Sequence, residues 1–238
     1  MAISDDINLK WGRETVFKFY HHVNSLKWYI VLTMLLVGCA RYPKIEMPQV
    51  SKNRLTITFE VKGTINPNSY YFLAFDDDDD PLDGPLPAVV KPFGNGWGTG
   101  SFTRFIEIHL SRATLFEVNP NDPLQPVLIG YPIDFEQRQS SITVTVDMDS
   151  FFRAGIPNAI DFNIIAVDEI ILDPNYEGIR SYDALGPRGN DYVTIPMQAT
   201  AEYRNGQGFI KELSGDAFPA GSDHLDIVDW EVKVVRVK

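Results

Sequence analysis

The sequence predicts an all-β protein, an antiparallel β-sandwich of jelly-roll or immunoglobulin-like type with about nine strands, which follows an N-terminal signal segment. Two observations predict this fold. From residue 54 onward, apolar and polar side chains alternate with a period of two, which is typical of strands with one buried face. Clusters of Pro, Gly, Asn and Asp separate these segments and leave little room for the helices that connect parallel strands. Antiparallel strands in two packed layers are therefore expected.

The first predicted strand, RLTITFEVKG, shows the pattern most clearly, because Leu55, Ile57 and Phe59 alternate with polar residues. Eight further segments carry a similar signal and have turn residues at their ends. The predicted strands are 54–63, 70–75, 101–110, 114–118, 126–132, 141–148, 159–168, 192–197 and 226–237. They form one domain, 54–238, because no internal repeat or linker interrupts them.

One short helix is expected between strands, in the sequence DMDSFFRAGI. Asp149 or Ser150 would cap it, because short polar side chains accept hydrogen bonds from the free N–H groups of a first helical turn. Phe151 and Phe152 would pack inward, and Gly155 would end the helix. The helix would therefore have only one or two turns.

The charge of the chain excludes some classes of partner. Asp and Glu outnumber Lys and Arg by 32 to 21, which gives a net charge of -11. Nucleic acids and anionic membrane surfaces bind basic surfaces, so neither is expected to bind the folded part. The single cysteine, Cys39, cannot form a disulfide within the chain, and the fold therefore depends on side-chain burial unless a metal contributes.

Residues 1–38 have the features of a signal peptide. Lys10, Arg13, Lys18 and Lys27 precede ten apolar or nearly apolar residues, WYIVLTMLLV. This stretch is too short for a transmembrane helix, which needs about 20 apolar residues. A membrane-spanning anchor is therefore not expected.

The next feature, LVGC at 36–39, resembles the bacterial lipobox, in which a branched apolar residue and small residues precede the cysteine. The resemblance implies that diacylglycerol is attached to the Cys39 thiol, that the chain is cleaved before Cys39, and that the new amino group can be acylated. Two or three acyl chains hold a protein firmly on a bilayer. Residues 39–53 would then be a tether. The alternative is a buried cysteine after a hydrophobic helix.

The residue after the cysteine bears on the location. Lipoproteins held at the inner membrane of Gram-negative bacteria typically carry Asp there, whereas this chain has Ala40. By the same resemblance, the protein is lipid-anchored in the bacterial cell envelope, at the outer membrane if the host has two membranes.

Five consecutive aspartates and then Asp83 follow the apolar segment YYFLAF. Adjacent carboxylates repel one another unless solvent or a cation screens them. Asp76, Asp78 and Asp80 alternate and could point to one place, where Asp83 and a carbonyl oxygen would complete the ligands of a Ca²⁺ ion. The spacing is not that of an EF-hand loop. A solvated acidic hairpin loop without an ion would explain the same residues.

A second loop, KPFGNGWGTG, alternates glycine with Phe93, Asn95 and Trp97. Glycines permit a tight turn that holds Trp97 at the surface, where aromatic side chains stack on sugar rings or fill a partner's pocket. These three residues are the candidate ligand-binding residues. The alternative is that Trp97 folds back and covers one end of the sandwich.

A third loop contains Asp183, Arg188 and Asp191. The two aspartates could join a metal site, or they could pair with Arg188 as a structural contact.

No Ser or Cys nucleophile motif and no histidine pair at metal-ligand spacing occurs after residues 1–38, so no enzyme is expected. A lipid-tethered hydrolase would need a clustered carboxylate pair in a cleft.

The segments YYFLAFD, FNIIAVD, NDYVTIPM and DWEVKVV resemble, in their strand pattern, β-sandwich modules of the DOMON type and of the ninth family of carbohydrate-binding modules, and also uncharacterised bacterial lipoproteins. The resemblance covers about 55–237 and implies sugar or haem binding, but no haem ligand pair is identifiable. We therefore expect a cell-envelope lipoprotein whose non-catalytic sandwich binds a glycan or a protein partner. The alternative is a structural or assembly component of an envelope complex.

Overall fold

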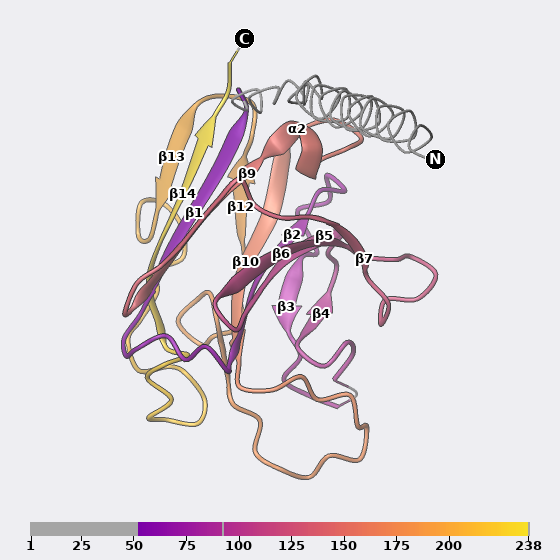
Figure 1. Ribbon diagram of the computed structural model, residues 1–238. Coiled ribbons are helices and arrows are strands. Elements are labelled where there is room, and N and C mark those ends of the chain that lie inside the picture. The colour runs from indigo at the N-terminus through magenta and orange to yellow at the C-terminus, as the bar shows by residue number, and fades with distance from the viewer. Residues whose placement is uncertain (1–51, 92, 238) are drawn as a thin grey trace, which may run out of the picture. The chain divides into compact units, whose positions relative to one another are not determined.

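The computed structural model describes residues 52–91 and 93–237, which belong to one compact unit. The predicted signal peptide, Cys39 and most of the predicted tether lie outside these residues. Within the described ranges, no helix has the length and apolar character needed to cross a membrane. The described chain is an antiparallel β-sandwich, as predicted, with one short helix (Figure 1).

Two antiparallel sheets form the sandwich. The first sheet has five strands, in the order β13 (Ala201–Arg204), β14 (Ile227–Val235), β1 (Arg54–Val61), β9 (Ser141–Asp147) and β8 (Asp134–Gln137). Six strands of the second sheet follow the order β11 (Tyr182–Ala184), β10 (Ala159–Val167), β2 (Tyr70–Asp76), β5 (Arg104–His109), β6 (Arg112–Glu117) and β7 (Val127–Gly130). The seventh, β12 (Val193–Pro196), pairs with β10.

The main core lies between these two sheets. Side chains alternate along β1, so Leu55, Ile57 and Phe59 face inward and are fully buried. On the other face, Thr56 Oγ1 lies 3.0 Å from Thr145 Oγ1 of the neighbouring β9. Each large apolar side chain that is fully buried contributes about 1.5–3 kcal/mol to folding. The alternating pattern therefore fixes which face of the five-stranded sheet is the inner one.

The central strands of the seven-stranded sheet are buried on both faces. Its central strands β2 and β10 have continuous apolar sequences, and almost all of their residues are buried. Phe72 and Ile165 form a second apolar cluster with Trp97. A two-stranded ribbon of β3 (Pro85–Pro87) and β4 (Gly98–Gly100) flanks this cluster. In Figure 1, β13, β14 and β1 of the five-stranded sheet lie on the left, β7 of the seven-stranded sheet lies on the right, and the ribbon of β3 and β4 lies below β2 and β5.

All nine predicted strands are present, most of them with shorter ends. The structure adds five strands of three or four residues, which are β3, β4, β8, β11 and β13. β3, β4 and β11 have only three residues, too few to show a period of two, and β8 and β13 are mostly polar, so neither kind of segment carries an apolar strand signal.

The predicted short helix is also present as α2 (Met148–Phe151), and Phe151 and Phe152 are both buried. The predicted cap was wrong. Asp147, the last residue of β9, caps the helix, because its Oδ1 accepts a hydrogen bond of 3.1 Å from the Asp149 N–H. Gly155 follows in a turn with a positive φ of 114°.

Candidate functional site

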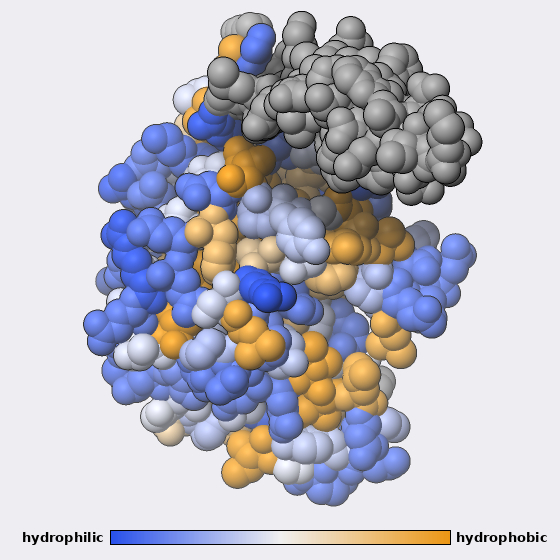
Figure 2. Space-filling view, in the orientation of Figure 1, coloured by the Kyte–Doolittle hydropathy of each residue, from blue (hydrophilic) through white to orange (hydrophobic). Residues whose placement is uncertain are grey.

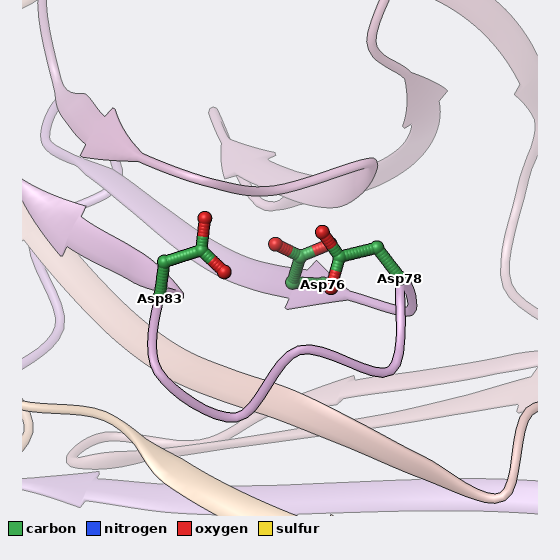
Figure 3. A group of neighbouring side chains, drawn as sticks. All are labelled: Asp76, Asp78 and Asp83. Atoms are coloured by element: carbon green, nitrogen blue, oxygen red, sulfur yellow. The ribbon is translucent and has the colours of Figure 1, made fainter.

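The acidic loop, residues 76–84, connects β2 to β3 and brings three carboxylates together. Oxygen atoms of Asp76, Asp78 and Asp83 all lie within 4.8 Å of one another. Asp76 ends β2, so the sheet fixes its position, whereas Asp78 and Asp83 are exposed. Figure 3 shows the side chain of Asp83 directed across the loop toward the other two.

The carboxyl group of Asp76 is buried without a well-formed hydrogen bond. The residue is 1% exposed, and no well-formed hydrogen bond reaches either of its carboxylate oxygens. Burial is the main cause that raises the pKa of Asp76; the nearby Ser101 hydroxyl lowers it, and the carboxylates of Asp78 and Asp83 raise it further. A buried carboxylate without donors is costly unless it is protonated or bound to a cation.

A fourth carboxylate lies behind the acidic loop. Asp161 on β10 pairs in register with Asp76, is 5% exposed, and accepts a hydrogen bond from the Thr194 hydroxyl. Burial raises the pKa of Asp161, and neighbouring carboxylates of the loop add to this effect. The buried Arg104 does not pair with Asp76 or Asp161. Its guanidinium binds Asp77 instead and lies 3.3 Å from a Glu117 carboxylate oxygen.

The predicted ligand set is thus brought together in part. Asp76, Asp78 and Asp83 form one group, but Asp80 does not join it. The Asp80 side chain instead turns back on the loop, where its Oδ1 accepts a hydrogen bond of 3.1 Å from the Leu82 N–H. A strict alternation of ligands was therefore the wrong pattern, because the loop makes a turn after Asp78.

The chemistry of the group suits a hard divalent cation. Ca²⁺ binds about six to eight oxygen ligands at about 2.3–2.6 Å, so oxygens within 4.8 Å of one another can share one ion. Three carboxylates leave part of the coordination sphere open, and the exposed Asp78 and Asp83 place that part toward solvent. The acidic loop can therefore hold a cation that also binds an external ligand.

An aromatic ring that the sequence did not identify borders the acidic loop. The Tyr192 ring lies so close to Gly84 that a Cβ there would be 2.8 Å from the ring. The Tyr192 hydroxyl donates a hydrogen bond of 3.3 Å to the Pro81 carbonyl. Tyr192 precedes β12, and only the pairing of β12 with β10 brings it to the end of β2.

The predicted aromatic binding surface was wrong. Trp97 is 3% exposed, and its ring stacks on Phe72 with 3.9 Å between the ring centroids. Asn95 Oδ1 accepts hydrogen bonds from the Trp97 and Gly98 N–H groups, so Asn95 shapes the turn rather than facing a ligand. The alternative, that Trp97 folds back, is the one found, although Trp97 covers the outer face of the seven-stranded sheet instead of one end. Phe72 and its neighbours make that face apolar, and it must be covered.

Phe93 is also buried, but it lines a shallow cavity of about 410 Å³. Arg180 lies over its ring, with 4.9 Å from the guanidinium carbon to the ring centroid. Arg180 Nη2 donates a hydrogen bond of 2.6 Å to the Gly96 carbonyl, whereas its Nε and Nη1 have no partner. Because these two nitrogens are enclosed by protein, a ligand would reach them only after the side chain moved.

The third loop does not form the predicted ion pair. Among the described residues, Arg188 is exposed and makes no ion pair with Asp183 or Asp191. Asp191 is exposed and its Oδ1 accepts the Tyr192 N–H, whereas Asp183 is fully buried among other carboxylates. The two aspartates therefore do not share a site.

Comparison of the chain with protein-family models, with curated proteins and with solved structures gives no match. What the chain binds is therefore inferred from the chemistry of its own residues.

Proposed function

We propose that the chain is a lipid-anchored, non-enzymatic binding module of the bacterial cell envelope, in which a Ca²⁺ ion at the acidic loop binds the hydroxyl groups of a glycan. The observation that supports this proposal best is the state of Asp76. Its carboxyl group is buried, no well-formed hydrogen bond reaches either oxygen, and it faces the carboxylates of Asp78 and Asp83. A cation at this point would satisfy all three groups at once.

The glycan part of the proposal follows from what surrounds the ion. Coordination positions that protein oxygens do not fill are open to solvent, and two neighbouring sugar hydroxyls can occupy them. The Tyr192 ring supplies an apolar surface beside the loop, on which the C–H face of a sugar ring can lie. The net charge of -11 favours a neutral glycan over an acidic one.

The glycan proposal predicts a binding activity that depends on both Ca²⁺ and Asp76. The full-length chain in detergent is applied to a glycan array with Ca²⁺ or with EGTA, and positive sugars are then titrated. Asp76→Asn is expected to abolish binding, whereas Asp80→Asn is the matched control and retains it, because Asp80 lies outside the group. Tyr192→Ala is expected to weaken glycan binding at least about fivefold, or about 1 kcal/mol, and to leave Ca²⁺ binding unchanged. Glycan binding that persists in EGTA would contradict the proposal.

The anchor is a separate prediction. Mass spectrometry of the membrane-extracted protein is expected to show an N-terminal peptide that begins at Cys39 and carries diacylglycerol, because residues 36–39 resemble a lipobox. A Cys39→Ser variant is expected to retain residues 1–38, because it lacks the thiol that the lipid is attached to. A free Cys39 thiol in a chain that still carries residues 1–38 would contradict the lipid anchor.

A second candidate function is assembly with another envelope protein. It is favoured by apolar side chains on and around β7, which is an edge strand of the seven-stranded sheet. The exposed residues are Leu124, Val127, Leu128, Tyr131 and Ile133. Figure 2 shows apolar groups among the polar surface in the part of the molecule where Figure 1 places β7. A photo-reactive residue at position 131 is expected to cross-link one specific envelope protein in cells, and the absence of any cross-link would leave only the glycan proposal.

A further inference from the structure

A second group of carboxylates lies far from the acidic loop in sequence and is more deeply buried. Oxygen atoms of Asp183, Asp216 and Asp226 all lie within 4.8 Å of one another. Asp183 belongs to β11 of the seven-stranded sheet, and Asp226 directly precedes β14 of the five-stranded sheet. The group therefore links edge strand β11 of one sheet to the start of β14 in the other, and Asp183 Oδ2 already accepts a hydrogen bond of 2.7 Å from the Ile227 N–H.

Several oxygens of this group are enclosed without any donor. Asp183 is fully buried, and its Oδ1 has no hydrogen-bond partner. Both carboxylate oxygens of Asp216 are likewise buried and unpaired. Glu212, which is 3% exposed, accepts the Gly186 N–H at 2.9 Å through Oε2, but its Oε1 has no partner. Buried polar atoms without partners are rare in proteins and usually mark an ion or a water that completes the site.

The protein supplies little positive charge to this group. Lys62 Nζ lies 3.6 Å from Asp226 Oδ2, but it is closer to the exposed Asp223, at 2.7 Å. The Gly215 N–H donates to both oxygens of Asp226, at 2.9 and 2.8 Å. Of the four acidic side chains, only Asp226 has an ion pair with a cation in the described part of the chain, and Lys62 shares that pair with Asp223. Burial raises the pKa of Asp183 to about 8 and that of Glu212 to about 9, because the enclosed site disfavours their charged forms.

We propose that Asp183, Asp216 and Asp226 bind a Ca²⁺ ion in a closed structural site, with Glu212 beside it as a fourth acidic group. All the donors are oxygen atoms, which Ca²⁺ prefers, and His and Cys ligands typical of Zn²⁺ are absent from the group. The unpaired oxygens of Asp183 and Asp216 are the ones the ion would contact. This ion would hold the start of β14 against β11 and so stabilise the junction of the two sheets.

This second site does not depend on the proposed glycan function, because it is enclosed and shares no residue with the acidic loop. The alternative is that the carboxylates are protonated and hydrogen-bonded to one another without metal. The two states differ in Ca²⁺ stoichiometry.

The test counts Ca²⁺ ions bound by the full-length chain in detergent. The protein is stripped with EGTA, dialysed and titrated with CaCl₂ by calorimetry, and its thermal unfolding is recorded in parallel. The wild-type chain is expected to bind two ions. Asp76→Asn, which leaves the closed site intact, is expected to bind one ion and to gain at least about 5 °C in Tm at 1 mM Ca²⁺.

Asp216→Asn removes a ligand from the closed site at a residue that is only half-buried, so the fold is expected to survive. This variant is expected to bind one ion, at the acidic loop, and to keep its Ca²⁺-dependent glycan binding. An Asp76→Asn chain that binds no Ca²⁺ at millimolar concentration would overturn the closed site, as would an ion that stays bound in the Asp76→Asn, Asp216→Asn double variant. An Asp76→Asn chain with one ion, together with a wild type that binds no glycan, would refute only the proposed function.

Discussion

Trp97→Ala is expected to lower the free energy of unfolding by about 3–5 kcal/mol, which is a large part of the stability of a typical domain. The Trp97 ring is 3% exposed and stacks on Phe72, and it also packs against Phe102 and Phe105. Its removal would leave a cavity over the outer face of β2. Urea denaturation followed by circular dichroism measures the change.

Tyr131→Ala is the matched control, because Tyr131 is 70% exposed and its loss is expected to change stability by less than about 0.5 kcal/mol. An unchanged urea midpoint for Trp97→Ala would show that the ring is not packed against the sheet. In that case the glycine-rich loop would again be a candidate binding surface.

A second large effect is expected from pH in the absence of Ca²⁺. Burial raises the pKa of Asp183 to about 8 and that of Glu212 to about 9, whereas both groups titrate near pH 4 in the unfolded chain. The folded chain therefore holds more protons than the unfolded chain between about pH 4 and pH 9. Stability is then greatest at the acidic end of this window and falls as pH rises.

Each unit of pKa difference corresponds to about 1.4 kcal/mol, so the expected loss from pH 5 to pH 9 amounts to several kcal/mol. The groups that face Asp183 and Glu212 are the carboxylates of Asp216 and Asp226, and Lys62 lies next to Asp226. Thermal unfolding in EGTA at pH 5, 7 and 9 measures the effect.

Glu212→Gln is expected to reduce the fall in Tm between pH 5 and pH 9, because one raised pKa is removed. Added Ca²⁺ is expected to reduce it as well, since a bound cation keeps the carboxylates ionised. A Tm that rises steadily from pH 5 to pH 9 in EGTA would contradict the burial of unpaired carboxylates in this group.

The sequence predicted the strands best where a single face is buried. β1, β9 and β14 belong to the five-stranded sheet, and their alternation was read directly. β2 and β10 were found as apolar runs, but their burial on both faces was not foreseen, because it depends on Trp97 and the ribbon of β3 and β4. Whether an aromatic residue in a glycine-rich loop faces solvent or core depends on the surface beneath it, which the local sequence does not contain.

The candidate sites were predicted to different extents, because only some of their residues are close to one another in the sequence. Asp76, Asp78 and Asp83 lie in one short loop, so their proximity could be read from the sequence. Asp161 reaches the same place only through the register of β10 with β2. The closed group was missed although Asp183 was singled out, since its partners come from a segment more than thirty residues later in the chain. In a sequence with many acidic residues, a single aspartate does not indicate which distant carboxylates will lie beside it in the fold.

The most direct test of the calcium-binding acidic loop is a crystal structure of the chain grown with Ca²⁺, with anomalous diffraction recorded to locate calcium. We predict an anomalous peak about 2.3–2.6 Å from carboxylate oxygens of Asp76, Asp78 and Asp83, with at least one coordination position facing solvent. The absence of a calcium peak there, with the Asp76 carboxyl group hydrogen-bonded to Ser101 instead, would contradict the account.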